Sequence, residues 1–124
     1  MINFFNDVVA GIAPLNVTAQ VLSSTLIRVA WDEIPPIDRN GIITLYEVLY
    51  VPLEIFGGLI SAEMVNTTDL SYDLVGLQEY VNYNISVRAY TRVGSGPYSA
   101  PITNQTLEDS KLIYYKVLVH VVLK

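Results

Sequence analysis

The chain has 124 residues, of which 52% are apolar and 15% charged, so it can bury the core of one domain and is not a disordered chain. Its formal net charge of −5 excludes a nucleic-acid partner, because binding to phosphates requires a basic patch. The charge is unevenly distributed. Residues 1–110 carry four arginines and all twelve acids, a net −8, whereas residues 111–124 carry three lysines and no acid, a net +3.

The chain contains no cysteine, which says little about its compartment because a core of this size does not need disulfides. The first residues lack a basic region, and Asp7 interrupts their apolar run, so they do not resemble a secretory signal. No stretch reaches the ~18 apolar residues of a membrane span. If the native protein is exported, we expect this chain to be a fragment of it.

The pattern predicts seven strands and no helix. Apolar residues at every second position indicate a strand with one buried face. Two examples are Ile27, Val29 and Trp31, and Tyr46, Val48 and Tyr50. Clusters of Gly, Pro and Asn separate the segments, and the spacing indicates an all-β sandwich or barrel. The predicted strands cover residues 17–22, 26–31, 44–51, 61–65, 70–74, 81–91 and 98–106.

The clearest strand is the sixth, where Tyr83, Ile85, Val87 and Ala89 alternate with polar residues. The turn 94–97, Gly-Ser-Gly-Pro, ends this strand, and the last strand is expected to begin near Tyr98. This hairpin contains no catalytic signature. It indicates a protein that holds or contacts something rather than transforming it.

Six elements occur in an order that resembles a fibronectin type III domain over residues 12–109. They are Trp31-Asp32, the strand 46–50, Leu77 six residues before Tyr83, the run 87–90, the turn and strand 94–99, and the run 106–109. The resemblance implies an all-β, seven-strand immunoglobulin-like sandwich. Residues 1–11 would be an N-terminal extension, and residues 110–124 an apolar basic tail. The loop 35–41 is similar to loops in animal receptor and cell-adhesion ectodomains.

The resemblance also assigns structural roles to residues of the core. Trp31 would fill the space between the sheets, with its indole N–H bonded to a partner. Tyr46 would share this core. Tyr83 would form a tyrosine corner, its hydroxyl bonded to the backbone of the preceding loop, and Leu77 would fill the core beneath that loop.

The inventory of reactive side chains argues against an enzyme. The only histidine is His120, which lies in the tail, and without cysteine neither thiol catalysis nor a structural zinc site can form. The acids Asp32, Glu33 and Asp38 leave a calcium site as an alternative, but their spacing favours a solvated acidic rim. We therefore expect no catalytic residue, no metal and no cofactor.

Four N-x-[ST] sequons, more than composition alone predicts, begin at Asn16, Asn66, Asn84 and Asn104. Glycans on some of them would place the protein in the secretory pathway. Alternation turns Asn84 outward, so we expect it to be the most accessible acceptor on a strand, whereas the pattern points Asn104 toward an apolar position.

Alternation also predicts an outward face on the third and sixth strands. A cross-strand pair of Glu47 with Arg88 would add a few tenths of a kcal/mol. The other outward residues either are scattered over the surface or form a contact face for a neighbouring domain or partner. The members of this candidate interaction face are Leu45, Leu49, Arg88 and Tyr90. A second apolar segment, Leu53, Ile55, Phe56, Leu59 and Ile60, either folds onto the core or forms another contact site.

The tail admits two structures. As a strand it would have one wholly apolar face, and its Val, Ile and Tyr content favours this choice. As a helix it would align Lys116, His120 and Lys124. A basic, apolar segment could contact a membrane. The alternative is that the tail is sequence from a gene boundary and does not belong to the domain.

Taken together, these features predict a non-enzymatic extracellular module that acts as a spacer and protein-interaction surface in a larger receptor or cell-adhesion protein. The alternative is a spacer in an intracellular scaffold or in a secreted multidomain enzyme. The sequons discriminate between them, because a cytosolic protein has no use for glycan acceptors.

Overall fold

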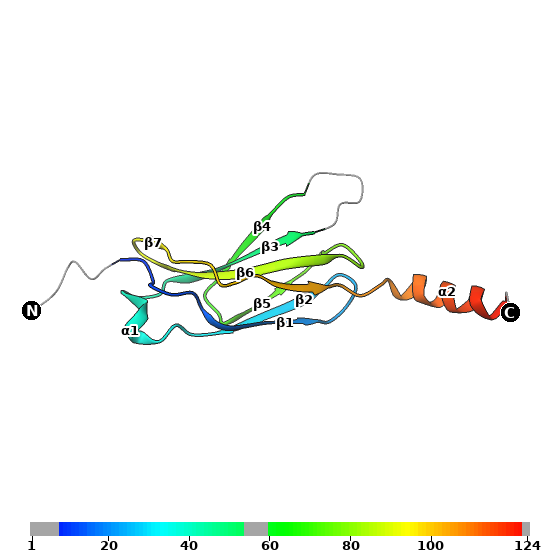
Figure 1. Ribbon diagram of the computed structural model, residues 1–124, viewed down its shortest axis with the longest axis horizontal. Helices are drawn as coiled ribbons and strands as arrows, with labels where there is room; N and C mark the ends of the chain where they lie inside the picture. The colour runs from blue at the N-terminus through cyan, green and yellow to red at the C-terminus, as the bar shows by residue number, and fades with distance from the viewer. Residues whose placement is uncertain (1–7, 54–59, 123–124) are drawn as a thin grey trace, which may run out of the picture.

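A computed structural model describes residues 8–53 and 60–122 of the chain. The described residues form strands in two layers, with a short helix at one end and a longer one beyond the other end (Figure 1). The elements are β1 (Leu15–Val21), β2 (Ile27–Asp32), α1 (Pro36–Arg39), β3 (Leu45–Pro52), β4 (Glu63–Thr67), β5 (Ser71–Leu74), β6 (Asn82–Thr91), β7 (Gly94–Ser95), β8 (Ile102–Gln105) and α2 (Ser110–Val122).

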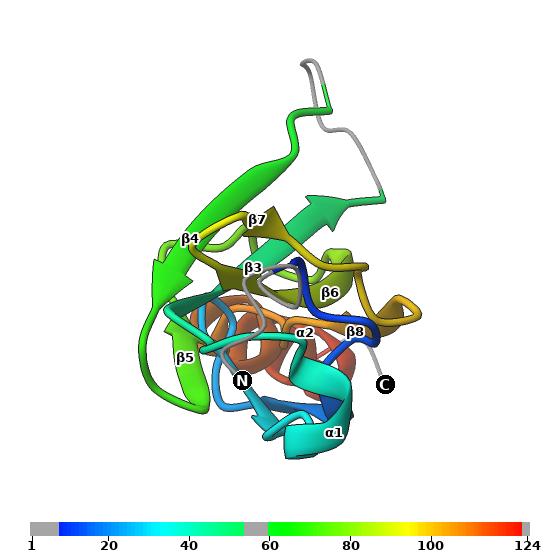
Figure 2. The ribbon, with the colours of Figure 1, turned by 90° about the vertical axis from the view of Figure 1, so that its left-hand side faces the viewer.

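The strands form two antiparallel sheets that face each other, which confirms the predicted sandwich. One sheet has the order β1-β2-β5, and the other has the order β4-β3-β6-β7, with β8 also paired to β6. Figure 2 shows the two layers end-on, with α1 at the near end. Strands β1 to β6 lie within two residues of the predicted ranges.

The core lies where the alternating faces of the two sheets meet. The pairing of β3 with β6 places Tyr46 opposite Ala89 and Val48 opposite Val87, and all four side chains are buried. From the other sheet, Ile27, Val29 and Trp31 of β2 point into the same space. Leu77, Tyr83 and Ala10 complete this core, so residue 10, within the predicted N-terminal extension, packs against the sandwich.

Trp31 is buried between the sheets, and its ring lies 5.5 Å from that of Tyr46 at a tilted angle of 59°. Such a tilted arrangement suits the quadrupoles of two aromatic rings. The expectation that the indole N–H has a partner is wrong for the described residues, where Trp31 Nε1 is buried without a hydrogen bond. Its neighbours in the core are aromatic rings and apolar side chains, which do not accept strong hydrogen bonds.

The last predicted strand, 98–106, is divided. β7 pairs with the end of β6, and β8 pairs with its beginning, while Tyr98 lies in the irregular segment between them. Pro97 and Pro101 have no N–H to donate to a ladder, which accounts for the interruption. Ser99 maintains contact with β6, because its N–H donates to Val87 O and its Oγ accepts from Val87 N.

The predicted loop 34–41 contains a four-residue helix, α1, with a proline in its first turn. Asn40 ends this helix in the left-handed conformation, with φ 57°. The segment that precedes β1 lies against this turn, since Val8 N donates to Asn40 O and Gly11 N donates to Asp38 O. The chain therefore enters the sandwich at the α1 end.

The preference for a strand in the tail is wrong, because residues 110–122 form the helix α2. Figure 1 shows α2 extending away from the sandwich at the end opposite α1. A strand in that position would lack a neighbour to bond, whereas a helix satisfies its N–H and C=O groups within the segment. Beta propensity decides little when no sheet edge is within reach.

A tyrosine corner closes the turn that precedes β6. Gln78 N donates to the hydroxyl oxygen of buried Tyr83 at 2.8 Å. The buried Thr106 Oγ1 adds a second link, because it accepts from Val81 N at 3.0 Å and donates to Gln78 O at 2.7 Å. The turn is thus fixed to β6 and to the segment that leads to α2.

We expect Tyr83→Phe to lower the free energy of unfolding by about 1–3 kcal/mol, because Gln78 N would keep no partner in a part-buried turn. Equilibrium unfolding in urea measures this loss. The matched control is Tyr80→Phe, at a ring that is 53% exposed, which should change stability by less than about 0.5 kcal/mol. Equal effects at both tyrosines would contradict the assigned corner.

Candidate interaction face

The outward positions of β3 and β6 are brought together by their register, which pairs Leu45 with Tyr90 and Glu47 with Arg88. Leu49 lies two residues further along β3 on the same face, opposite Ser86. The four members of the candidate interaction face, Leu45, Leu49, Arg88 and Tyr90, therefore share one surface of the sheet, and each is half-buried.

Glu47 lies at the centre of this face and is only 6% exposed. Its Oε1 accepts from Arg88 Nε at 2.9 Å and from the hydroxyl of Tyr98, and its Oε2 accepts from the hydroxyl of Tyr90 at 3.0 Å. A buried carboxylate is costly unless it is paired and hydrogen-bonded. Glu47 meets both conditions.

The guanidinium of Arg88 is held on several sides. Besides Glu47, it donates to Ser95 Oγ at 3.2 Å and to the Tyr90 hydroxyl at 2.9 Å. It also lies 4.3 Å from the ring centroid of Tyr98 and 5.2 Å from that of Tyr90, within the range of cation–π attraction. We call the residues Glu47, Arg88, Tyr90, Ser95 and Tyr98 the Glu47 network.

The network keeps Glu47 ionised and Tyr98 protonated. Burial acts to raise the pKa of Glu47, but the hydrogen bonds from Tyr98, Arg88 and Tyr90 outweigh it and hold the pKa below its usual value. Burial, together with the hydrogen bond to Glu47, raises the pKa of Tyr98 to about 12. The Tyr98 hydroxyl is therefore a hydrogen-bond donor and not a nucleophile at neutral pH.

The alternation of the strands predicted the Glu47–Arg88 pair, but it did not predict that Glu47 is buried or that other side chains bond to it. An exposed pair is worth a few tenths of a kcal/mol, whereas here Glu47 is buried and also accepts a hydrogen bond from the Tyr98 hydroxyl. The contribution of Tyr98 was missed because this residue was placed in a regular strand, where the direction of its side chain would follow alternation. The only sign of this network in the sequence is that an acidic and a basic residue lie opposite each other at outward positions of two strands.

The network changes what the face can offer to a partner. Arg88 has three hydrogen-bonding partners within the domain, and Tyr90 uses its hydroxyl internally. The apolar atoms are contributed instead by Leu45, Leu49 and Met64, which pairs with Leu49 in the sheet and is 57% exposed. The arrangement can therefore bind an apolar surface, with its own charges already neutralised.

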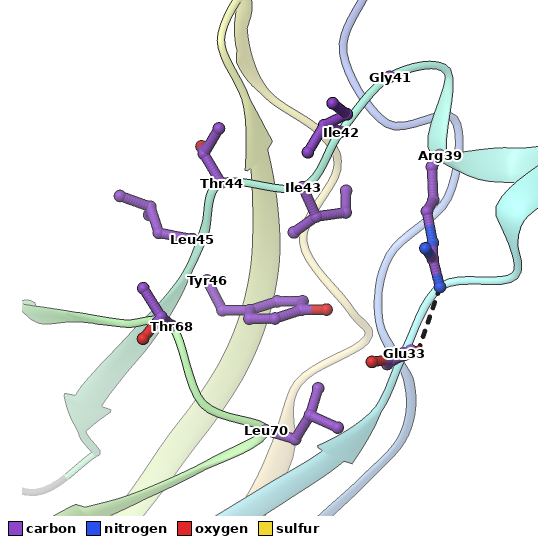
Figure 3. Close-up of a pocket in the computed structure, with 10 residues that line it drawn as sticks. All are labelled: Glu33, Arg39, Gly41, Ile42, Ile43, Thr44, Leu45, Tyr46, Thr68 and Leu70. Carbon is purple, nitrogen blue, oxygen red and sulfur yellow. Dashed lines mark hydrogen bonds and ion pairs between the residues drawn. The ribbon is translucent and has the colours of Figure 1, made fainter.

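A separate hollow of about 290 Å³ opens near the α1 end, between the segment leading into β3 and the β4–β5 turn. Figure 3 shows the ring of Tyr46 extending across it, with the Glu33–Arg39 ion pair of 3.2 Å on the side of the hydroxyl. The pKa of Tyr46 is raised mainly by burial and secondly by the negative charge of Glu33. The Tyr46 hydroxyl thus remains protonated at neutral pH.

The four sequon asparagines differ in exposure. Asn16 and Asn66 are exposed, whereas Asn84 and Asn104 are half-buried. The expectation that Asn84 is the most accessible strand acceptor is therefore wrong. β6 has β3 and β8 on its two sides, and Thr103 Oγ1 donates to Asn84 Oδ1 at 2.6 Å, whereas Asn66 lies on the edge strand β4.

Asn104 donates from Nδ2 to Ala19 O at 3.3 Å and so faces β1. Within residues 8–53 and 60–122, no group of three acidic or histidine side chains could hold a metal ion. No helix in that same part of the chain has the length and apolar character to cross a membrane. Of the second apolar segment, Leu53 and Ile60 are exposed, and Ile55, Phe56 and Leu59 lie outside the described residues.

The depressed pKa of Glu47 predicts a pH dependence of stability. Because the folded pKa lies below the unfolded value of about 4.3, the stabilisation is complete above about pH 5 and is lost as the pH falls through the folded pKa. We expect Glu47→Gln to cost about 1.5–3 kcal/mol at pH 7 and much less near pH 3, as measured by urea unfolding at both pH values.

The control is Glu79→Gln at an exposed carboxylate, which should have a small effect that is similar at the two pH values. A cost of Glu47→Gln that is the same at pH 7 and pH 3 would show that the carboxylate is not stabilised in its ionised form.

The fold and the face can be compared with known proteins. A family model for the fibronectin type III domain matches residues 12–105. The chain is 39% identical over 97 residues to receptor-type tyrosine-protein phosphatase F of Bos taurus, and 37% identical over 105 residues to protein sidekick of Drosophila melanogaster. These alignments cover 77% and 84% of this chain but only 5% of each relative.

Among solved structures, the third fibronectin III domain of the human KIAA0343 protein matches with a TM-score of 0.74 and 25% identity, over 89% of this chain and 93% of that one. All the strands from β1 to β8 lie within the residues matched by the family model. This chain belongs to the fibronectin type III domain family.

Proposed function

We propose that this chain is a non-enzymatic extracellular spacer and protein-interaction module of a larger receptor or cell-adhesion protein, with residues 12–109 as the folded unit. The observation that carries the proposal is the 39% identity to a receptor-type phosphatase in which the matched region is 5% of the length. The fibronectin type III domain is a non-catalytic module, and activity in such a protein resides in other domains.

The role as a spacer is supported by the path of the chain. Residues 8–11 lie at the α1 end, and α2 leaves at the opposite end of the long axis (Figure 1). A domain entered and left at opposite ends extends a chain of domains, rather than folding it back. Thr106 is bonded to the turn of the tyrosine corner, which fixes the point at which the chain leaves the sandwich.

The interaction surface is proposed to be the outward face of β3, β4 and β6, with Leu45, Leu49 and Met64 as its apolar part and Arg88 and Tyr90 as its polar centre. Protein interfaces combine an apolar core with polar groups. Since Arg88 is paired with Glu47 inside the domain, covering this face leaves no unpaired charge. Protein partners or neighbouring domains of the same protein would bind here.

An extracellular location is tested by glycosylation. We expect secretion from an animal cell, behind an added signal peptide, to attach glycans at two or more of the four sequons. Asn16 and Asn66 should be occupied first because they are exposed. Mass spectrometry before and after glycosidase treatment reads the occupancy at each site.

Two variants provide matched controls at one sequon. Asn66→Gln removes the acceptor, and Thr68→Ala removes only the recognition residue, so both should lose the same glycan. Efficiently secreted protein without any glycan would remove the support for an extracellular module and favour a cytosolic spacer.

A further inference from the structure

The outer edge of β4 is open in the part of the chain that the structure describes. β4 pairs with β3 on one side, and it ends the sheet β4-β3-β6-β7. Figure 2 shows β4 at the margin of its layer, with β3 on its inner side. An edge strand presents a row of backbone N–H and C=O groups to which another strand can bond. The β4 edge is therefore a place where a strand from outside the domain can be added.

The other edges of the sandwich are short, charged or covered. β7 has two residues and β5 has four, and Asp73 of β5 forms an ion pair with Arg28 at 2.7 Å. β1 has a shift of register near its start, and Ala19 O in this strand accepts from Asn104 Nδ2 of β8. Short edge strands, charges and bulges are the usual means by which proteins prevent pairing at an edge.

β4 lacks these protective features. Its five residues, Glu-Met-Val-Asn-Thr, include no proline and no lysine, and its single charge lies at the first position, Glu63. Its register against β3 is unbroken. Met64 is 57% exposed, and Val65 and Thr67 are β-branched residues, which suit a strand. A strand that is largely apolar and nearly uncharged readily pairs with another strand.

The sequence of β4 is compatible with itself in an antiparallel pair. If two copies pair about Val65, Met64 of each copy lies opposite Asn66 of the other, and Glu63 lies opposite Thr67. No like charges are then directly opposed, and the two sheets join with their outward faces on the same side. Since every copy of the chain presents this same edge, a second copy is the strand that fits it.

Asn66 is the position at which a glycan would prevent this pairing. Asn66 is exposed, it begins the sequon 66–68, and its position opposite Glu47 places it on the outward face of the sheet. Side chains that lie directly opposite each other in an antiparallel pair have Cβ atoms about 5 Å apart. A sugar on Asn66 Nδ2 would therefore occupy the space that Met64 of the second copy needs.

We propose that a glycan on Asn66 caps the β4 edge and prevents β4 from pairing with β4 of a second copy. The glycan would thus keep the module monomeric, which is a role beyond that of an attachment in the secretory pathway. This inference rests on the proposed function for the presence of the glycan, whereas the pairing of unglycosylated β4 depends on the fold alone.

The test compares preparations of the full 124-residue chain by sedimentation velocity over a series of concentrations. Chain made in bacteria, which lacks glycans, should form dimers as its concentration rises. Chain secreted from animal cells, with Asn66 shown by mass spectrometry to be occupied, should remain monomeric. Thr68→Ala from the same cells should dimerise like the bacterial chain, because this variant loses the glycan on Asn66 and keeps the other sequons.

A pair of double variants of the bacterial chain locates the contact. Met64→Lys/Asn66→Lys should weaken dimerisation roughly tenfold or more, because it places ammonium groups directly opposite each other in the paired strands. The matched control is Leu45→Lys/Leu49→Lys, which adds the same charge to the same face on the inner strand β3 and should leave edge pairing unchanged. Circular dichroism checks that each variant is folded.

The proposal is overturned if the bacterial chain stays monomeric, or if chain with an occupied Asn66 dimerises equally well. Equal dimerisation of both lysine variants would also overturn it and assign the contact to another surface, such as α2. Loss of the dimer in the β3 variant alone would assign the contact to the outward face. If Asn66 carries no glycan while other sequons do, the cap is overturned and the proposed function stands.

Discussion

The register of β3 against β6 is the constraint on which the rest of the structure depends. Tyr46 and Val48 enter the core because they lie opposite Ala89 and Val87. The same register turns Glu47 and Arg88 outward and opposite each other. A slip of one residue would put Glu47 into the apolar core and Val48 into solvent, so burial of one face fixes the chemistry of the other.

The Glu47 network has a structural consequence beyond its own charges. Pro97 and Pro101 interrupt the pairing with β6 between β7 and β8, where the backbone hydrogen bonds to β6 come from the N–H groups of Gly96 and Ser99. The Tyr98 hydroxyl on Glu47 and the Ser99 side chain on Val87 N fix this segment across the interruption. The buried carboxylate of Glu47 thus serves mainly to position the last part of the domain, and it contributes less to overall stability.

The network also connects the fold to the proposed contact surface. It occupies the middle of the outward face, and the hydrogen bonds of Arg88 are made within the domain. The apolar side chains that a partner can reach on this face include Leu49 and Met64. Asn66 is paired with Glu47 across β3 and β4, on this same face, and a glycan there would restrict a partner to the side of β6. Modification and recognition of this face would therefore compete.

Alternation in the sequence was sufficient to predict the strands β1 to β6 and the buried positions Trp31, Tyr46 and Tyr83, because a period of two directly reports one apolar face. It did not predict features that depend on what lies nearby. Tyr98 reaches Glu47 from an irregular segment, Asn84 is partly covered by two neighbouring strands, and α2 is helical where no sheet edge is within reach. Propensity and alternation are properties of one segment of the sequence. The position of Tyr98, the exposure of Asn84 and the helical structure of α2 depend instead on what lies next to each segment in the fold.

The register itself is most directly tested by cross-strand contacts between backbone protons in a solution NMR spectrum of this chain. We expect Glu47 and Arg88 to be directly opposed, with Leu45 opposite Tyr90 and Leu49 opposite Ser86. Contacts that instead pair Glu47 with Val87 or with Ala89 would contradict this register, because the core and the Glu47 network could not then both form.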